Sequence, residues 1–184
     1  PSEISRRNEI IKGPHGLLSV AGGKLTSYRS MAERLVDECQ KKLNQKPSPS
    51  PTAKEPLPGG DFTGTLESLK SHLEKSGLDS YESERAAHLY GSEARDIFAK
   101  GKGPEVEAEF AVLNEGALTL EDYWVRRSSR AHFDLDGGMA SLEPAARRMG
   151  ELLNWSSEER SRQIEICKAL REAEITVVRQ PKGI

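Results

Sequence analysis

The stretch "GLLSVAGGKLTSYRSMAERLVDECQ", residues Gly16–Gln40, changes its hydrophobic period at a pair of glycines. Before the glycines, an apolar run at residues 17–21 predicts a short buried strand. After them, apolar residues recur every three or four positions, which predicts an amphipathic helix that begins near Leu25 or Thr26. Strand, glycine turn and helix start, in this order, are typical of an anion-binding site.

The turn itself, Gly22-Gly23-Lys24, carries the groups that such a site needs. Two glycines let the backbone approach a ligand closely, the helix start offers unpaired N–H groups, and Lys24 adds a positive charge. A nucleotide-binding P-loop is excluded, because Leu18 stands where that motif has its first glycine and Leu25 stands where it has a hydroxyl. From the pattern alone, a tight turn with a solvated lysine remains the open alternative.

Composition narrows the class of protein further. The chain has 184 residues with a net charge of -2, so nothing in its overall charge favours binding of nucleic acid. Four scattered histidines predict no metal site, and no apolar run approaches the ~20 residues of a membrane span. We interpret Cys39 and Cys167 as reduced thiols in a cytosolic protein. Because the chain begins at Pro1, shortly before the glycine turn, we expect it to be part of a longer polypeptide.

A proline-rich stretch, "KPSPSPTAKEPLPGG", divides the chain. Its prolines exclude a regular helix or a central strand, so it predicts a linker over residues 46–60. We predict a strand-turn-helix segment at 1–45 before the linker, a helical domain at 61–178 after it, and a tail at 179–184. The predicted fold class is therefore mainly α: a short strand, turn and helix followed by an all-α bundle of about six or seven short helices.

Two local signals lie inside the helical part. Thr119 and Asp122 loosely fit a capping box at a helix start, with Asp in place of the usual Glu or Gln. Arg126, Arg127 and Arg130 follow closely and predict one of two things. They form a basic patch for an acidic partner or for another domain, or they complement the dipole at the end of a helix.

The segment "GLLSVAGGKLTSYRSMAE" resembles the last flavin-contacting segment of FAD-dependent, quinone-linked glycerol-3-phosphate dehydrogenases. Their pattern is a strand, then G-G-K-[LYM]-T-[TSG]-Y-R, then a helix. Further stretches resemble the same family in the same order, which makes the resemblance specific over most of the chain, to about Gln163. They are "PSEISRRNEI" with its Ser5-Arg6 pair, "LPGGDF" at 57–62, "YGSEA" at 90–94, "AEFAVLNEGALTLEDYWVRRS" at 108–128 and "NWSSEE" at 154–159.

The resemblance implies where the cofactor binds. The helix after the turn would point at the pyrimidine end of the FAD isoalloxazine, and its N-terminus would stabilise the negative charge of reduced flavin. The residues implied to contact FAD are Gly22, Gly23, Lys24, Leu25 and Thr26.

The resemblance also implies a substrate site. Lys24 and Arg6 would surround the phosphate of glycerol 3-phosphate or the flavin edge, because paired cations suit a dianion. Which of the two contacts the phosphate stays open. The dinucleotide fingerprint G-x-G-x-x-G is absent from this chain, and so is any obvious base for the substrate proton. We therefore predict no catalytic residue here, and expect the isolated chain to bind no FAD and to be inactive.

In the parent enzyme, a hydride would pass from C2 of sn-glycerol 3-phosphate to FAD, giving dihydroxyacetone phosphate, and the electrons would go to a quinone. The expected parent is cytoplasmic and peripherally attached to the inner face of the cytoplasmic membrane. Its helical domain would pack against its own flavin domain, and a homo-oligomer is one option. Two alternatives stay open: a non-catalytic helical interaction module, or a related FAD oxidase with another substrate.

Overall fold

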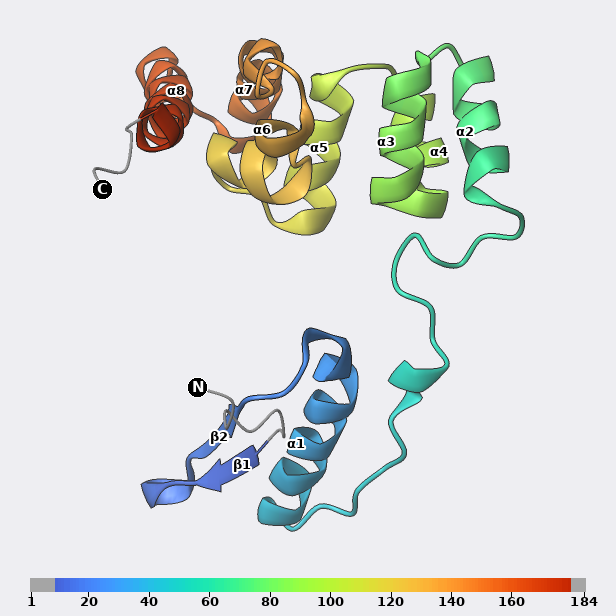
Figure 1. Cartoon of the computed structure of the whole chain (residues 1–184), viewed down its shortest axis with the longest axis vertical. Helices are drawn as coiled ribbons and strands as arrows, with labels where there is room; N and C mark the ends of the chain where they lie inside the picture. The colour runs from blue at the N-terminus through green and yellow to red at the C-terminus, as the bar shows by residue number, and fades with distance from the viewer. Residues whose placement is uncertain (1–8, 180–184) are drawn as a thin grey trace. The chain divides into compact units, whose positions relative to one another are not determined.

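The computed structural model describes residues 9–179. Contacts divide the chain into two compact units, Pro1–Leu57 and Pro58–Ile184, and each is described by itself. The regular structure of the described residues consists of eight α-helices and one two-stranded sheet (Figure 1). The predicted mainly-α fold is therefore confirmed.

The N-terminal unit contains the sheet and one helix. Strand β1, Glu9–Lys12, pairs antiparallel with β2, Leu18–Ala21, and Ile10 lies opposite Val20. The chain then makes a 3-10 turn at Leu25–Ser27 before helix α1, Tyr28–Lys42. A strand forms where it was predicted, but the prediction that it is buried was wrong, because no residue of β2 is buried among the described residues of this unit. The helix begins later than predicted, because the 3-10 turn Leu25–Ser27 comes first.

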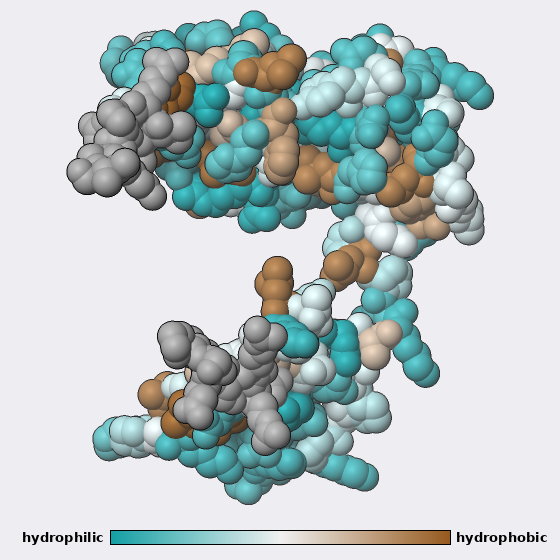
Figure 2. All heavy atoms as spheres, in the orientation of Figure 1, coloured by the Kyte–Doolittle hydropathy of each residue, from teal (hydrophilic) through white to brown (hydrophobic). Residues whose placement is uncertain are grey.

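This unit has no core of its own among the described residues. All the buried apolar side chains of the described chain lie between Leu69 and Cys167, and helix α1 buries none of its residues. Tyr28, Val36 and Leu43 on α1 are exposed, and apolar atoms lie at the surface of this unit (Figure 2). Since apolar burial is the main stabilising term in folding, this unit needs a further surface to cover it.

The proline-rich stretch forms no α-helix and no strand, as predicted; its one regular element is the 3-10 turn Pro51–Ala53. It ends where Gly59 packs against the end of a helix in the C-terminal unit. The backbone N–H of Ser92 donates to the Gly59 carbonyl at 2.9 Å. Gly59 has φ +79°, and a Cβ there would lie 2.3 Å from the carbonyl oxygen of Tyr90, so only glycine fits this contact.

The C-terminal unit is helical, and its described residues contain no strand. Its seven α-helices confirm the predicted bundle, although the last is longer than the short helices predicted, because Ser156 caps its start and residues 157–179 contain no glycine or proline. The helices are α2 (Leu66–Lys75), α3 (Ser80–Tyr90), α4 (Ala94–Ala99), α5 (Pro104–Glu115), α6 (Arg130–Phe133), α7 (Met139–Leu153) and α8 (Ser157–Arg179).

Two separate hydrophobic clusters fill this unit, and α5 borders both of them. The first cluster, built from α2, α3 and α4, includes Leu69 and Phe98, and Phe110 of α5 packs against it. The second includes Trp124 and Met149 and takes Ala108 and Ala111 from the other side of α5. Cys167 is a buried free thiol in this second cluster.

A π-helical turn, Asp122–Arg127, connects α5 to α6. The predicted capping box is confirmed: Thr119 Oγ1 accepts from the Asp122 N–H at 3.1 Å, and Asp122 Oδ2 accepts from the Thr119 N–H at 3.0 Å. The wider turn brings Trp124 into the core, where its indole N–H donates to the Gly137 carbonyl at 3.0 Å.

Candidate functional site

The glycine turn lies where β2 ends. Gly22 and Gly23 have φ of +78° and +96°, a conformation that costs a residue with a Cβ about 1 kcal/mol or more. Lys24 then returns to an extended conformation. The Ser27 N–H and hydroxyl both donate to the Lys24 carbonyl, at 2.9 and 2.8 Å, which fixes the first turn before α1.

The turn has groups of the kind that can bind an anion at the start of the 3-10 helix Leu25–Ser27, whereas the first N–H of α1, from Tyr28, already donates to the Leu25 carbonyl. The first N–H groups of a helix have no partner inside the helix, and they carry the positive end of its dipole. An open cavity of about 550 Å³ adjoins the turn, and the exposed fraction of Leu25 beside it reaches 90%. The residues that line the cavity are Val20, Gly22, Gly23, Lys24, Leu25, Tyr28, Met31, Ala32 and Leu35.

The structure thus brings together the turn residues named from the sequence: Gly22, Gly23, Lys24 and Leu25 all line one cavity, and Thr26 lies in the same 3-10 turn. Arg6 lies outside the described residues, so the predicted pairing of Lys24 with Arg6 stays a prediction.

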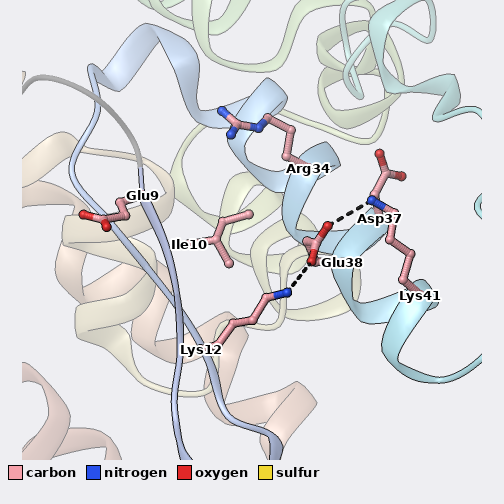
Figure 3. A pocket seen from close by; sticks show the side chains of 7 residues that line it. All are labelled: Glu9, Ile10, Lys12, Arg34, Asp37, Glu38 and Lys41. Atoms are coloured by element: carbon pink, nitrogen blue, oxygen red, sulfur yellow. Dashed lines mark hydrogen bonds and ion pairs between the residues drawn. The ribbon is translucent and has the colours of Figure 1, made fainter.

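A second cavity, of about 390 Å³, lies between β1 and α1 and includes none of the turn residues. Figure 3 shows Glu38 between two lysines: its carboxylate pairs with Lys12 at 3.2 Å and with Lys41 at 2.9 Å. The hydrogen bonds from Lys41 and Lys12 lower the pKa of Glu38. This cluster joins the strand to the helix, which is a structural role.

The described residues contain neither a metal site nor a membrane-spanning helix. Within residues 9–179, His, Cys, Asp and Glu side chains form no group of three that could hold a metal ion. Over the same residues, the structure contains no helix that is both long and apolar enough to cross a membrane.

The prediction that Arg130 belongs to a basic patch or complements a helix dipole was wrong. It grouped this residue with Arg126 and Arg127, but the Arg130 side chain is only 4% exposed and pairs with the buried Glu107 at 2.6 Å. Arg126 does lie at the surface, where it pairs with Glu121 and Asp122. The apolar residues around Glu107 and its position inside α5 were the sequence signal that a buried partner was required.

A protein family model matches more than half of the chain. Residues 50–160 match the family described as the C-terminal domain of alpha-glycerophosphate oxidase. This range covers more than half of the chain and includes every helix from α2 to α7.

Curated proteins extend the similarity to most of the chain. An aerobic glycerol-3-phosphate dehydrogenase of Bacillus subtilis is 30% identical over 197 residues, which cover 94% of this chain and 36% of that protein. An alpha-glycerophosphate oxidase of Streptococcus pneumoniae is 30% identical over 88% of this chain and 30% of its own length. The chain spans about a third of the length of these relatives.

A solved structure is similar as well. The glycerol-3-phosphate dehydrogenase of Bacillus halodurans, complexed with FAD, matches with a TM-score of 0.73 and 30% identity. The match covers 89% of this chain and 37% of that one.

Proposed function

The chain belongs to the family of the C-terminal domain of alpha-glycerophosphate oxidase, and from this premise we propose that it forms the C-terminal part of an FAD-dependent glycerol-3-phosphate dehydrogenase. The whole protein oxidises sn-glycerol 3-phosphate to dihydroxyacetone phosphate. This chain supplies the last segment of the flavin domain, at its N-terminal end, and the helical domain after it.

The observation that carries the proposal is the turn at Gly22 and Gly23, in a chain whose relatives include an enzyme complexed with FAD. The turn fits an anionic ring edge: both glycines have positive φ and both line an open cavity beside a helix start. No apolar side chain in the described part of the N-terminal unit is buried, which supports its being one piece of a larger domain. FAD, when bound, supplies the hydride acceptance of the reaction.

The residues of this chain bind and orient the flavin and the substrate. When FAD is bound, the N–H groups at the start of the 3-10 turn Leu25–Ser27 would stabilise negative charge on the flavin ring, and the exposed Leu25 would be available to contact it. Lys24 provides a positive charge at the same cavity. With Arg6, it binds the phosphate of the substrate or the flavin edge, because charge-assisted contacts are the strong ones for a dianion.

The helical domain packs against the flavin domain of the same polypeptide. The exposed apolar residues of α1, Tyr28 and Val36, and the absence of a core in the described part of their unit support a domain that is completed by other segments. This role does not exclude the alternative of an interaction module, since one surface serves both.

The reduced FAD of the whole protein passes its electrons to an acceptor. We favour a quinone, with the protein peripherally attached to the inner face of the cytoplasmic membrane and a homo-oligomer as one option. An alpha-glycerophosphate oxidase among the relatives favours a second candidate, in which the acceptor is another oxidant.

A steady-state assay of the full-length protein tests these points together. We expect sn-glycerol 3-phosphate to reduce a soluble quinone analogue, while glycerol, which lacks the phosphate, supports no turnover. Consumption of dioxygen in place of the quinone would favour the oxidase. No turnover with glycerol 3-phosphate, in a preparation that contains its flavin, would contradict the proposal.

A further inference from the structure

A cluster of buried and half-buried charged side chains lies between the two hydrophobic cores of the C-terminal unit. It comprises Glu82 and Arg85 of α3, Glu107 of α5, Arg130 of α6 and Asp134 just after α6, and we call it the ion cluster. Neither the proposed flavin site nor the family resemblance assigns it a role.

Arg130 is the centre of the ion cluster. Its guanidinium pairs with Glu107 at 2.6 Å, with Glu82 at 2.8 Å and with Asp134 at 2.9 Å. Arg85 pairs with both Glu107 and Glu82. The cluster thus joins α3, from the first hydrophobic core, to α6, beside the second.

Glu107 has a full set of partners. Its carboxylate is 0% exposed, and besides the two arginines it accepts from the hydroxyl of Tyr90 at 3.0 Å and from that of Tyr123 at 3.5 Å. Burial raises the pKa of both tyrosines, which keeps each hydroxyl protonated and able to donate. One carboxylate therefore contacts an element of the first core, Tyr90, and an element of the second, Tyr123.

Apolar contacts between the two halves are limited to the sides of α5. Phe110 packs against the first core while Ala108 and Ala111 belong to the second, and no residue is shared between the cores. Hydrophobic contact is non-directional and lets one surface slide on another. Charge-assisted hydrogen bonds fix distance and angle, and an ion pair in the interior is screened little by salt.

From this arrangement we propose that the ion cluster is a lock, which makes the two helical halves of the C-terminal unit, α2–α4 and α5–α8, unfold and move as one body. The lock is independent of the proposed enzymatic function. Without Arg130, α2–α4 keeps its contacts with α5 and the hydrogen bonds that Tyr81 and Arg85 of α3 donate to the segment 128–134, and we expect that these are too few to stop it from opening separately. The smaller first core makes that half the one that opens first.

The experiment compares two probes in the purified protein during urea unfolding. Both tryptophans, Trp124 and Trp155, lie at the second core, so their fluorescence reports α5–α8, whereas far-UV circular dichroism reports all helices. We expect the two transitions to coincide in the wild type and to separate in Arg130→Met, with the dichroism lost first. Amide hydrogen exchange in α2 and α3 should become about tenfold faster or more, without a matching change in α7.

Two further variants make the result specific. Arg126→Met is the matched control, because Arg126 is 54% exposed and its loss should leave the transitions coincident. Arg130→Met leaves three carboxylates in the ion cluster with Arg85 as their one arginine, and the double variant Glu107→Gln/Arg130→Met removes one of those buried negative charges, so it should regain stability and still show separate transitions. The double variant also provides the test of separate transitions if Arg130→Met does not fold. Coincident transitions and equal changes of exchange in a folded double variant would overturn the proposal, as would separate transitions in the wild type.

Discussion

At the scale of single residues, Lys24 connects the sequence pattern to the proposed chemistry. It follows two glycines of positive φ, lines the open cavity, and accepts at its carbonyl the hydrogen bonds that close the turn. The backbone contacts hold the turn whichever side chain is present. The ammonium group of Lys24 is thus available for a ligand. Removing this side chain should therefore affect ligand binding without affecting folding.

In the full-length protein, we expect Lys24→Ala to lower kcat/KM for glycerol 3-phosphate roughly 10- to 100-fold, because a lost charge-assisted contact costs about 1.5–3 kcal/mol. Thermal stability should stay within about 0.5 kcal/mol, as for other exposed side chains. Lys54→Ala, an exposed lysine of the same unit, is the control and should leave both quantities unchanged. Normal kcat/KM in Lys24→Ala with full flavin content would mean that the turn has only a structural role.

At the scale of elements, structure that depends on neighbouring residues could be predicted from the sequence, whereas contacts between distant segments could not. The Thr119–Asp122 capping box and the proline-rich break are fixed by neighbours in the sequence, so they could be predicted. The partners of Arg130 lie up to 48 residues away, in α3 and α5, and no local pattern pairs them. The same holds for the contact of Gly59 with Tyr90, which depends on the packing of two separate segments.

The ion cluster predicts how the C-terminal unit responds to acid. Burial alone would raise the pKa of Glu82, but the hydrogen bond from Arg130 and the charges of Arg85 and Arg130 outweigh it and lower the pKa below its ordinary value of 4.5. A lowered pKa in the folded state gives stability that is present above pH 4.5 and lost as the pH falls through the folded value. We expect the free energy of unfolding to decrease steadily below pH 4.5.

Urea unfolding between pH 7 and pH 3 measures this dependence. Glu82→Gln should lower the free energy of unfolding at pH 7. Breaking a buried ion pair costs about 3–5 kcal/mol, and we expect a loss at the lower end of this range because Glu82 is 25% exposed. The variant should also lose less stability in acid than the wild type. An equal acid dependence in both proteins would show that other carboxylates cause it.

We expect the two units to differ in whether they fold when each is produced alone. Residues 58–184 contain both hydrophobic cores, so this piece should fold alone, with strong helical circular dichroism and a cooperative melt. Residues 1–57 have no buried apolar side chain in their described part and should show little structure alone. Loss of the cooperative melt in the 58–184 piece would contradict this division.

At the scale of the whole molecule, the sequence allowed the fold class and the order of strand, glycine turn and helix to be predicted, because both rest on local periodicity and on one short motif. It did not reveal that the described part of the N-terminal unit buries no apolar side chain, since the helix has the same amphipathic pattern whether or not a partner covers it. Only packing in three dimensions distinguishes a complete domain from a part of one. That distinction supports the proposal that residues 1–57 form one part of a larger domain.

The most direct test is anaerobic reduction of the flavin in the full-length protein. The account predicts that one equivalent of sn-glycerol 3-phosphate removes the absorbance of the oxidised flavin and yields dihydroxyacetone phosphate, whereas glycerol leaves the absorbance unchanged. A flavin that dithionite reduces but glycerol 3-phosphate does not, or a full-length protein without flavin, would contradict the account.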